Sequence, residues 1–125
     1  MKAYIIPATV IAMAMYFASA AYAQAPFDSQ DGILVNESGM TLYTYDKDKA
    51  GSGESSCYDQ CAQNWPPAEA PADASASGDY TIIERKDGTK QWAWQGQPLY
   101  TFVKDQNPGD RSGDKVGGVW HIVEE

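Results

Sequence analysis

The chain has one histidine and two cysteines among its 125 residues, so the side chains that serve most nucleophilic and metal sites are scarce. No Gly-x-Ser-x-Gly motif and no Gly-rich phosphate loop occurs, which argues against a Ser-His-Asp hydrolase and a P-loop protein. The spacing Cys57-x-x-x-Cys61 also differs from the Cys-x-x-Cys-His motif that attaches a c-type haem. We expect no cofactor and no catalytic residue, although the 17 acidic residues leave carboxylate-pair chemistry open.

Basic side chains are few as well. Nine Lys and Arg stand against 17 Asp and Glu, which gives a formal charge of −8. Nucleic acids and anionic lipids both require a cationic protein surface. The composition therefore predicts neither partner, and we interpret the acidic charge as a solubility feature.

The N-terminal segment is typical of a secretory signal. Lys2 precedes an apolar run over 4–16, and Ala21-Tyr22-Ala23 fits the rule for signal-peptide cleavage. A membrane anchor is the competing interpretation, because the run approaches the length of a membrane span. Pro7 inside the run argues against it, and so does the absence of a Lys or Arg between the end of the run and Lys47. No cysteine follows the expected cut, so we expect no lipid attachment. We also expect the mature protein to be periplasmic or secreted, and to be a monomer.

The expected organisation is a signal peptide, a short tail and a single domain made of two halves. These segments are 1–23, 24–30 and 31–125, with the halves at about 31–67 and 79–125.

Short runs of β-branched and aromatic residues between Gly-containing turns predict an antiparallel all-β fold. The expected strands are 33–35, 40–46, 80–84, 90–94, 99–103 and 119–123. One short helix is expected over 57–64, capped by Ser56 and ended by Pro66-Pro67. The Ala- and Pro-rich segment 69–78 is expected to be a loop.

An internal repeat is the clearest feature of the chain. The ten residues from Gly39 to Asp48 align with Gly96 to Asp105 at an offset of 57, with six identities. Duplication explains this pattern, and one copy alone could not cover its apolar face. We expect the copies to pair about an approximate twofold axis, with Leu42 equivalent to Leu99.

The repeated segments carry a motif that resembles one in a bacterial family of predicted lipoproteins, also described as secreted repeats of unknown function. The motif is Tyr-x-aromatic-x-x-Asp, here Tyr43, Tyr45 and Asp48, then Tyr100, Phe102 and Asp105. Further matches are Cys57-x-x-x-Cys61, Trp65-Pro66-Pro67, Gly96-Gln97-Pro98-Leu99-Tyr100 and Gly117-Gly118-Val119-Trp120. The resemblance implies export and a two-repeat architecture but no reaction. Many members are lipid-anchored, and this chain lacks the cysteine that such an anchor requires.

We interpret the motif residues as structural. Side chains alternate along a strand, so Tyr43 and Tyr45 share one face and are expected in the core. Asp48 and Asp105 lie just beyond their strands, where each carboxylate can accept N–H groups of the following loop.

Cys57 and Cys61 are the only cysteines, and in an oxidising compartment an even count predicts a disulfide. The alternative is a thiol-dependent protein that exchanges disulfides or binds Cu(I), with His121 as a third copper ligand.

Two acidic loops have a partial calcium-site pattern. Asp46-x-Asp48-x-x-Gly51-x-x-Glu54 lacks an oxygen ligand at two required places. A second oxygen-rich loop contains Asp105, Asn107, Asp110 and Asp114. We expect solvated, capped turns rather than calcium sites.

Trp92 and Trp94 share one face of an expected strand. An open face would be an aromatic platform for a glycan or an envelope protein. We favour a closed, core-facing pair. The sequence as a whole predicts a non-catalytic binding or envelope-accessory module, with the thiol-dependent copper or redox protein as the alternative.

Overall fold

The computed structural model describes residues 24–125, so the expected signal peptide lies outside the described residues. The elements are β1 (Asp28–Gln30), β2 (Ile33–Val35), β3 (Tyr43–Tyr45), α1 (Gln60–Asn64), β4 (Glu69–Ala70), β5 (Tyr80–Glu84), β6 (Lys90–Trp94), β7 (Gln97–Pro98), the 3₁₀-helix η1 (Val116–Gly118) and β8 (Trp120–Ile122). Every strand pairing is antiparallel, which confirms the expected all-β class with one short helix near the cysteines.

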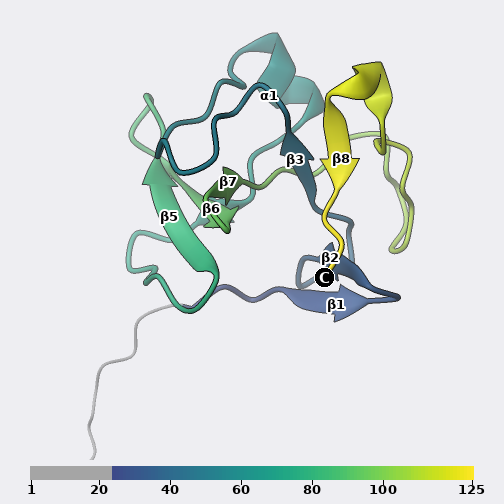
Figure 1. Cartoon of the computed structure of the whole chain (residues 1–125), viewed down its shortest axis with the longest axis horizontal. Helices are drawn as coiled ribbons and strands as arrows, with labels where there is room; N and C mark the ends of the chain where they lie inside the picture. The colour runs from purple at the N-terminus through teal and green to yellow at the C-terminus, as the bar shows by residue number, and fades with distance from the viewer. Residues whose placement is uncertain (1–23) are drawn as a thin grey trace, which may run out of the picture.

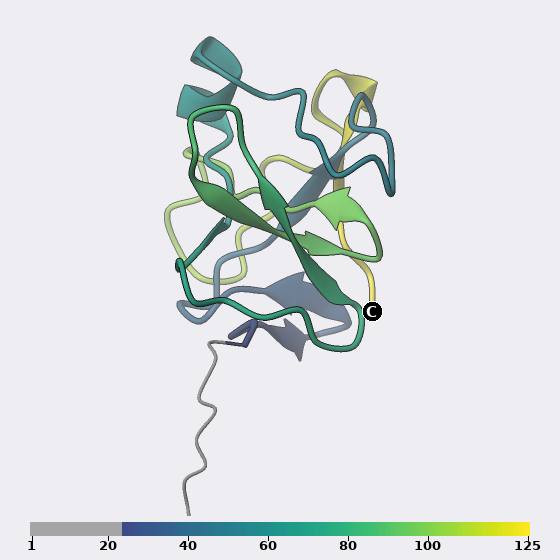
Figure 2. The ribbon, with the colours of Figure 1, turned by 90° about the vertical axis from the view of Figure 1, so that its left-hand side faces the viewer.

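The strands form three small sheets. β1 pairs with β2, β3 pairs with β8, and β6 lies between β4 and β5 with β7 also bonded to it. Figure 1 shows β3 and β8 side by side and the C-terminus ending next to β2. Figure 2 shows the β5–β6 hairpin crossing the front of the molecule. The hairpin turns at Asp87-Gly88, where Gly88 has a φ of 89°, a conformation that favours glycine.

The two repeats meet at their tyrosines. The backbone N–H of Tyr43 donates to the carbonyl of Tyr100 at 2.8 Å, and the N–H of Tyr100 donates back at 3.0 Å. This reciprocal pair is what an approximate twofold axis between the copies requires. Each tyrosine also has a second neighbour, Ile122 for Tyr43 and Pro67 for Tyr100.

Both faces of the repeated segments are buried, in two separate clusters. Leu42 and Leu99 are fully buried on one side with Leu34, Trp92 and Val123. The tyrosine side forms the second cluster, which consists of Tyr43, Cys57, Trp65, Tyr100, Phe102 and Trp120. Alternation along the strand thus divides the apolar residues of each repeat between two cores.

Four local expectations need correction, and the first is the helix. It begins at Gln60 rather than at 57, and Ser56 does not cap it. Ser56 instead donates its N–H to Asp48 and its hydroxyl to the carbonyl of Lys47. The carbonyl of Cys57 is bonded to Arg85, so this stretch is held outside the helix.

The second correction concerns 99–103, which forms no continuous strand. This segment runs beside 64–68 and bonds to it at several points, among them the N–H of Thr101 to the carbonyl of Pro66. Pro66 and Pro67 have no N–H to donate, so the ladder remains incomplete.

The other two corrections concern segments that were expected to be unstructured. Asp28–Gln30 of the expected tail forms β1, and Phe27 packs against Tyr80 and Trp92. Glu69–Ala70 forms β4, and Ala68, Ala70 and Ala74 pack on the Trp92 cluster. Small side chains fit here because a large indole lies beneath them.

Candidate functional site

Each repeat's tyrosine is bonded to the other repeat's aspartate. The hydroxyl of Tyr43 donates to Asp105 Oδ2 at 2.6 Å, and that of Tyr100 donates to Asp48 Oδ2 at 2.5 Å. All four side chains are buried. Hydrogen bonds from a hydroxyl to a carboxylate are short and strong, so the exchange ties the two copies together at their centre.

The second oxygen of each aspartate holds its own loop. Asp48 Oδ1 accepts the N–H of Ser56 at 2.6 Å, and Asp105 Oδ1 accepts the N–H of Ser112 at 2.9 Å. Each carboxylate therefore joins a loop of its own repeat to the tyrosine of the other repeat. This arrangement gives a physical reason for the spacing between tyrosine and aspartate in the motif.

Burial changes the acidity of these groups. It raises the pKa of the Tyr43 and Tyr100 hydroxyls far above 10.0, and the bonds to the carboxylates raise it further. Burial also raises the pKa of the Asp48 carboxyl, while the hydrogen bonds from Tyr100 and Ser56 partly oppose that rise. The phenols therefore remain protonated donors at neutral pH.

A four-ring stack lies beside the paired tyrosines. Its order is Tyr45, Trp120, Trp65 and Phe102, with centroid separations of 4.1, 3.8 and 4.0 Å and interplanar angles of 12°, 4° and 16°. The two tryptophans meet at the pseudo-twofold axis, and the aromatic residue of each motif forms one end. The edge-on contacts are equivalent too: Tyr43 to Trp65 at 5.3 Å and Tyr100 to Trp120 at 5.2 Å.

A buried arginine supports one tyrosine–aspartate pair only. Arg85 is 4% exposed, and its guanidinium donates to Ser55 Oγ, Gln91 Oε1 and the carbonyl of Cys57 at 3.1, 2.7 and 2.6 Å. It also lies 4.3 Å from the centroid of the Tyr58 ring. Ser55 Oγ is in turn 2.6 Å from the Tyr100 hydroxyl. The network therefore reaches Asp48 through Ser55 and Tyr100.

Sequence reasoning missed Arg85, Ser55 and Gln91. Arg85-Lys86-Asp87 has the composition of a solvated turn, and no repeat copy marks these positions. No local signal distinguishes the buried arginine from its exposed neighbour Lys86.

Cys57 and Cys61 form a disulfide with a Cα–Cα distance of 5.2 Å, as expected. In this state neither sulfur is a thiolate. His121, the other residue of the copper alternative, is bonded through Nε2 to Asp46 Oδ2 at 2.8 Å on the surface. Among residues 24–125, no group of three or more His, Cys, Asp or Glu side chains is placed to hold a metal ion.

Trp92 and Trp94 do not form an open platform. Trp92 is 1% exposed inside the leucine cluster, and Trp94 packs half-buried against the same cluster. Trp92 therefore lies in the core, where Phe27 packs edge-on against its ring with centroids 6.1 Å apart.

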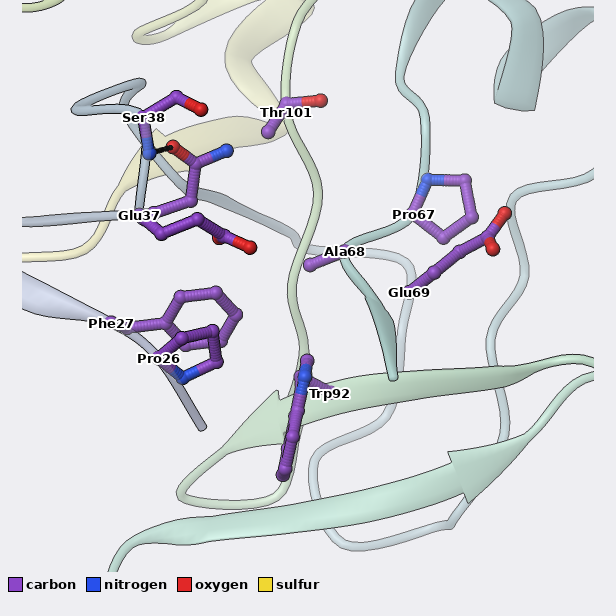
Figure 3. Close-up of a pocket in the computed structure, with 10 residues that line it drawn as sticks. Pro26, Phe27, Glu37, Ser38, Pro67, Ala68, Glu69, Trp92 and Thr101 are labelled. Atoms are coloured by element: carbon purple, nitrogen blue, oxygen red, sulfur yellow. Dashed lines mark hydrogen bonds between the residues drawn. The ribbon is translucent and has the colours of Figure 1, made fainter. Parts of the chain in front are cut away.

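The surface has a shallow depression of about 260 Å³ near the covered indole. Figure 3 shows Pro26 and Phe27 on one side, Glu69 and Pro67 on the other, and Glu37 above Phe27. The depression thus combines one half-exposed aromatic ring with two exposed carboxylates.

These features define a pseudo-symmetric two-repeat β domain with a shared aromatic and carboxylate centre. The chain belongs to the family described as secreted repeat of unknown function, whose model matches it twice, at 26–69 and 81–124. The family assignment confirms the resemblance seen in the motifs. Because the family is described as secreted, it also supports export of this protein. No curated protein and no solved structure matches the chain significantly. Within 24–125, no helix is long and apolar enough to cross a bilayer.

Proposed function

We propose that the mature domain is a non-catalytic binding module of the bacterial envelope, located in the periplasm or secreted. The observation that carries this proposal is the internal use of the family motif. Tyr43 and Tyr100 are buried and bonded to the buried motif aspartates Asp105 and Asp48. These four side chains build the scaffold and are closed to a substrate, so we assign recognition to the surface of the domain.

The depression is the surface that we assign to binding. Its volume of about 260 Å³ lies just below the range of pockets that enclose a drug-sized molecule. This size suits one inserted side chain or one sugar ring. The half-buried ring of Phe27 supplies an apolar face, Glu37 supplies hydrogen-bond acceptors next to it, and Glu69 supplies them at the opposite side of the depression (Figure 3).

The test uses the domain 24–125, purified with its disulfide intact, on a glycan array and in pull-downs from envelope extract. Glu37→Lys and Glu69→Lys change the depression, and Glu54→Lys is the matched control on an exposed loop outside its lining. We expect the first two substitutions to abolish a binding signal that the control retains. Equal loss or equal retention in all three variants would contradict the assigned surface.

The alternative, a thiol-dependent copper or redox protein, requires the disulfide to open. Alkylation of the native protein before and after mild reductant measures this directly. Resistance of both sulfurs to mild reductant supports the binding module, whereas free thiols that take up Cu(I) support the alternative.

A further inference from the structure

The four-ring stack is closer and flatter than most aromatic contacts in proteins. Aromatic pairs prefer offset or edge-to-face arrangements with centroids 4.5–7 Å apart. Here three successive contacts are nearly parallel with centroids at 4.1, 3.8 and 4.0 Å. Facing π-systems at this separation overlap, so a missing electron on one indole can move to the other. Indole and phenol are also the side-chain rings that are most easily oxidised.

A proton acceptor stands at the side of this stack. A phenol that loses an electron becomes a stable neutral radical only when its proton leaves as well. Tyr100 touches Trp120 edge-on at 5.2 Å, and its hydroxyl is 2.5 Å from Asp48 Oδ2. That distance is within reach for direct proton transfer. Because burial raises the pKa of Asp48, this carboxylate is a stronger base than an exposed aspartate.

The two ends of the stack differ in chemistry and in exposure. Tyr45 is half-buried and carries a hydroxyl, whereas Phe102 is 8% exposed and carries none. Asp46, which follows Tyr45 with 52% of its side chain exposed, is bonded to His121 and precedes the exposed Lys47, so the negative field comes from the formal charge of −8 on the whole chain. This end can therefore meet an oxidant, and a positively charged one is favoured.

We propose that the stack is a one-electron relay from the Tyr45 end to the Tyr100–Asp48 pair, which accepts oxidation from a cationic one-electron oxidant such as an oxidised metal complex. The oxidant gains one electron from the Tyr45–Trp120 contact. The vacancy passes through Trp120 to Tyr100, whose phenolic proton moves to Asp48 Oδ2. The products are the reduced oxidant, a neutral Tyr100 phenoxyl radical and a neutral Asp48 carboxylic acid. This role is independent of the binding surface proposed above.

The experiment uses the domain 24–125 with its disulfide intact. A light flash in the presence of a sacrificial electron acceptor generates the oxidant, tris(bipyridine)ruthenium(III). Transient absorption and freeze-quenched electron paramagnetic resonance follow the radical. We expect a tyrosyl radical that disappears in Tyr100→Phe. Asp48→Asn should slow its formation by about a hundredfold, because a positioned base contributes 10²–10⁴ to such a step.

The pseudo-symmetry supplies the matched controls. Tyr43→Phe and Asp105→Asn alter the equivalent pair beside Trp65, one ring further from Tyr45, and should change the radical less than Tyr100→Phe and Asp48→Asn do. Tyr45→Phe introduces the residue type found at the other end of the stack, Phe102, and should slow the transfer of the first electron to the oxidant. An unchanged rate in Tyr45→Phe would overturn the entry point, and an equal radical yield in Tyr100→Phe would overturn the relay.

A fluorinated tyrosine at position 100 tests the same point without removing the hydrogen bond. It keeps the hydroxyl, so the measurement does not depend on the folding of Tyr100→Phe. We expect fluorine coupling in the radical spectrum. A spectrum without that coupling would place the radical elsewhere, for example on Tyr58 or Tyr80 outside the stack, and would refute the proposal.

Discussion

The hydroxyl of Tyr100 has two side-chain partners, Asp48 and Ser55, whereas the hydroxyl of Tyr43 has one, Asp105. The second partner of Tyr43 is the backbone N–H of Gly113 at 3.1 Å. The two pairs thus share their central bond, the serine N–H on each aspartate and the edge-on tryptophan, and they differ in the second partner of the tyrosine hydroxyl. Duplication kept the geometry that joins the copies, while the surroundings diverged into a side-chain network on one side and a close backbone contact on the other.

The close backbone contact depends on a glycine. A Cβ atom on Gly113 would lie 2.6 Å from the Trp65 ring and 2.9 Å from the Tyr43 ring. Ser55, which fills the comparable place beside Tyr100, needs room for its hydroxyl and for Arg85. Gly113 and Ser55 lie outside the motif, and each suits the surroundings of only one of the two tyrosine–aspartate pairs.

The largest effect is expected where the copies differ most, at Arg85. Arg85→Ala leaves two buried acceptors, Gln91 Oε1 and the Cys57 carbonyl, without their side-chain donor and removes the packing of the arginine stem. We expect a loss of about 3 kcal/mol or more in the free energy of unfolding, since each unsatisfied buried group costs about 1–3 kcal/mol. Urea denaturation measures it. The exposed Arg111→Ala is the control and should stay within about 0.5 kcal/mol, whereas similar losses in both variants would contradict the role of the network.

The two aspartates give the next comparison. Asp48→Ala and Asp105→Ala should each lower the free energy of unfolding by about 1–3 kcal/mol. We expect the larger loss for Asp105→Ala. Both variants leave a tyrosine hydroxyl without its acceptor, because Ser55 Oγ already accepts the N–H groups of Cys57 and Arg85, and Gly113 offers only an N–H. The two losses differ because burial makes the ionised form of Asp48 costly, which reduces the loss on its removal.

Chemical denaturation of the two alanine variants settles the order, with double-mutant cycles against Tyr100→Phe and Tyr43→Phe. Coupling should appear across the repeats, between Tyr100 and Asp48 and between Tyr43 and Asp105. Coupling within one repeat, such as Tyr43 with Asp48, would contradict the exchanged arrangement.

The exchange of partners also marks the limit of what the sequence could predict. The repeat and the strand alternation gave the pseudo-twofold, and the strands at 33–35, 80–84 and 90–94 were predicted with the bounds that the structure has. The bond from Asp48 to its own loop follows from local chain chemistry. Its bond to Tyr100 does not, because it depends on the packing of residues 52 positions apart. Burial of Arg85 is likewise a tertiary effect.

Alkaline titration extends the comparison to both phenols together. The pKa values of Tyr43 and Tyr100 are raised above 10.0 in the folded state by burial and by the carboxylate bonds. Below pH 10.0 both tyrosines are protonated in the folded and the unfolded chain, so their contribution to the free energy of unfolding is fully present. Above it the unfolded chain loses phenolic protons that the folded chain keeps, so stability falls as the pH rises, by about 1.4 kcal/mol per pH unit and tyrosine.

Urea melts over a series of alkaline pH values measure this slope. Tyr43→Phe and Tyr100→Phe should each flatten it. Phenolate absorbance in the near ultraviolet should show both groups ionising only when the domain unfolds. Ionisation of either tyrosine in the folded domain near the ordinary value would contradict the assignment.

The smallest effect, none at all, is expected from calcium, although both acidic loops carry part of a binding pattern. Most of the aspartate groups that such a site would need are already bonded within the protein. Asp48 and Asp105 each bond to a tyrosine and a loop N–H, Asp46 bonds to His121, and Asp110 accepts the N–H groups of Gln106 and Asn107. A ligand raises the melting temperature only by binding the folded state in preference to the unfolded chain. The melting temperature should therefore be the same with chelator and with millimolar calcium. A contrary result would be a melting temperature several degrees higher in calcium, with the rise lost in Asp48→Ala or Asp105→Ala. That result would make the loop of the substituted aspartate a metal site, and the two copies would no longer be equivalent.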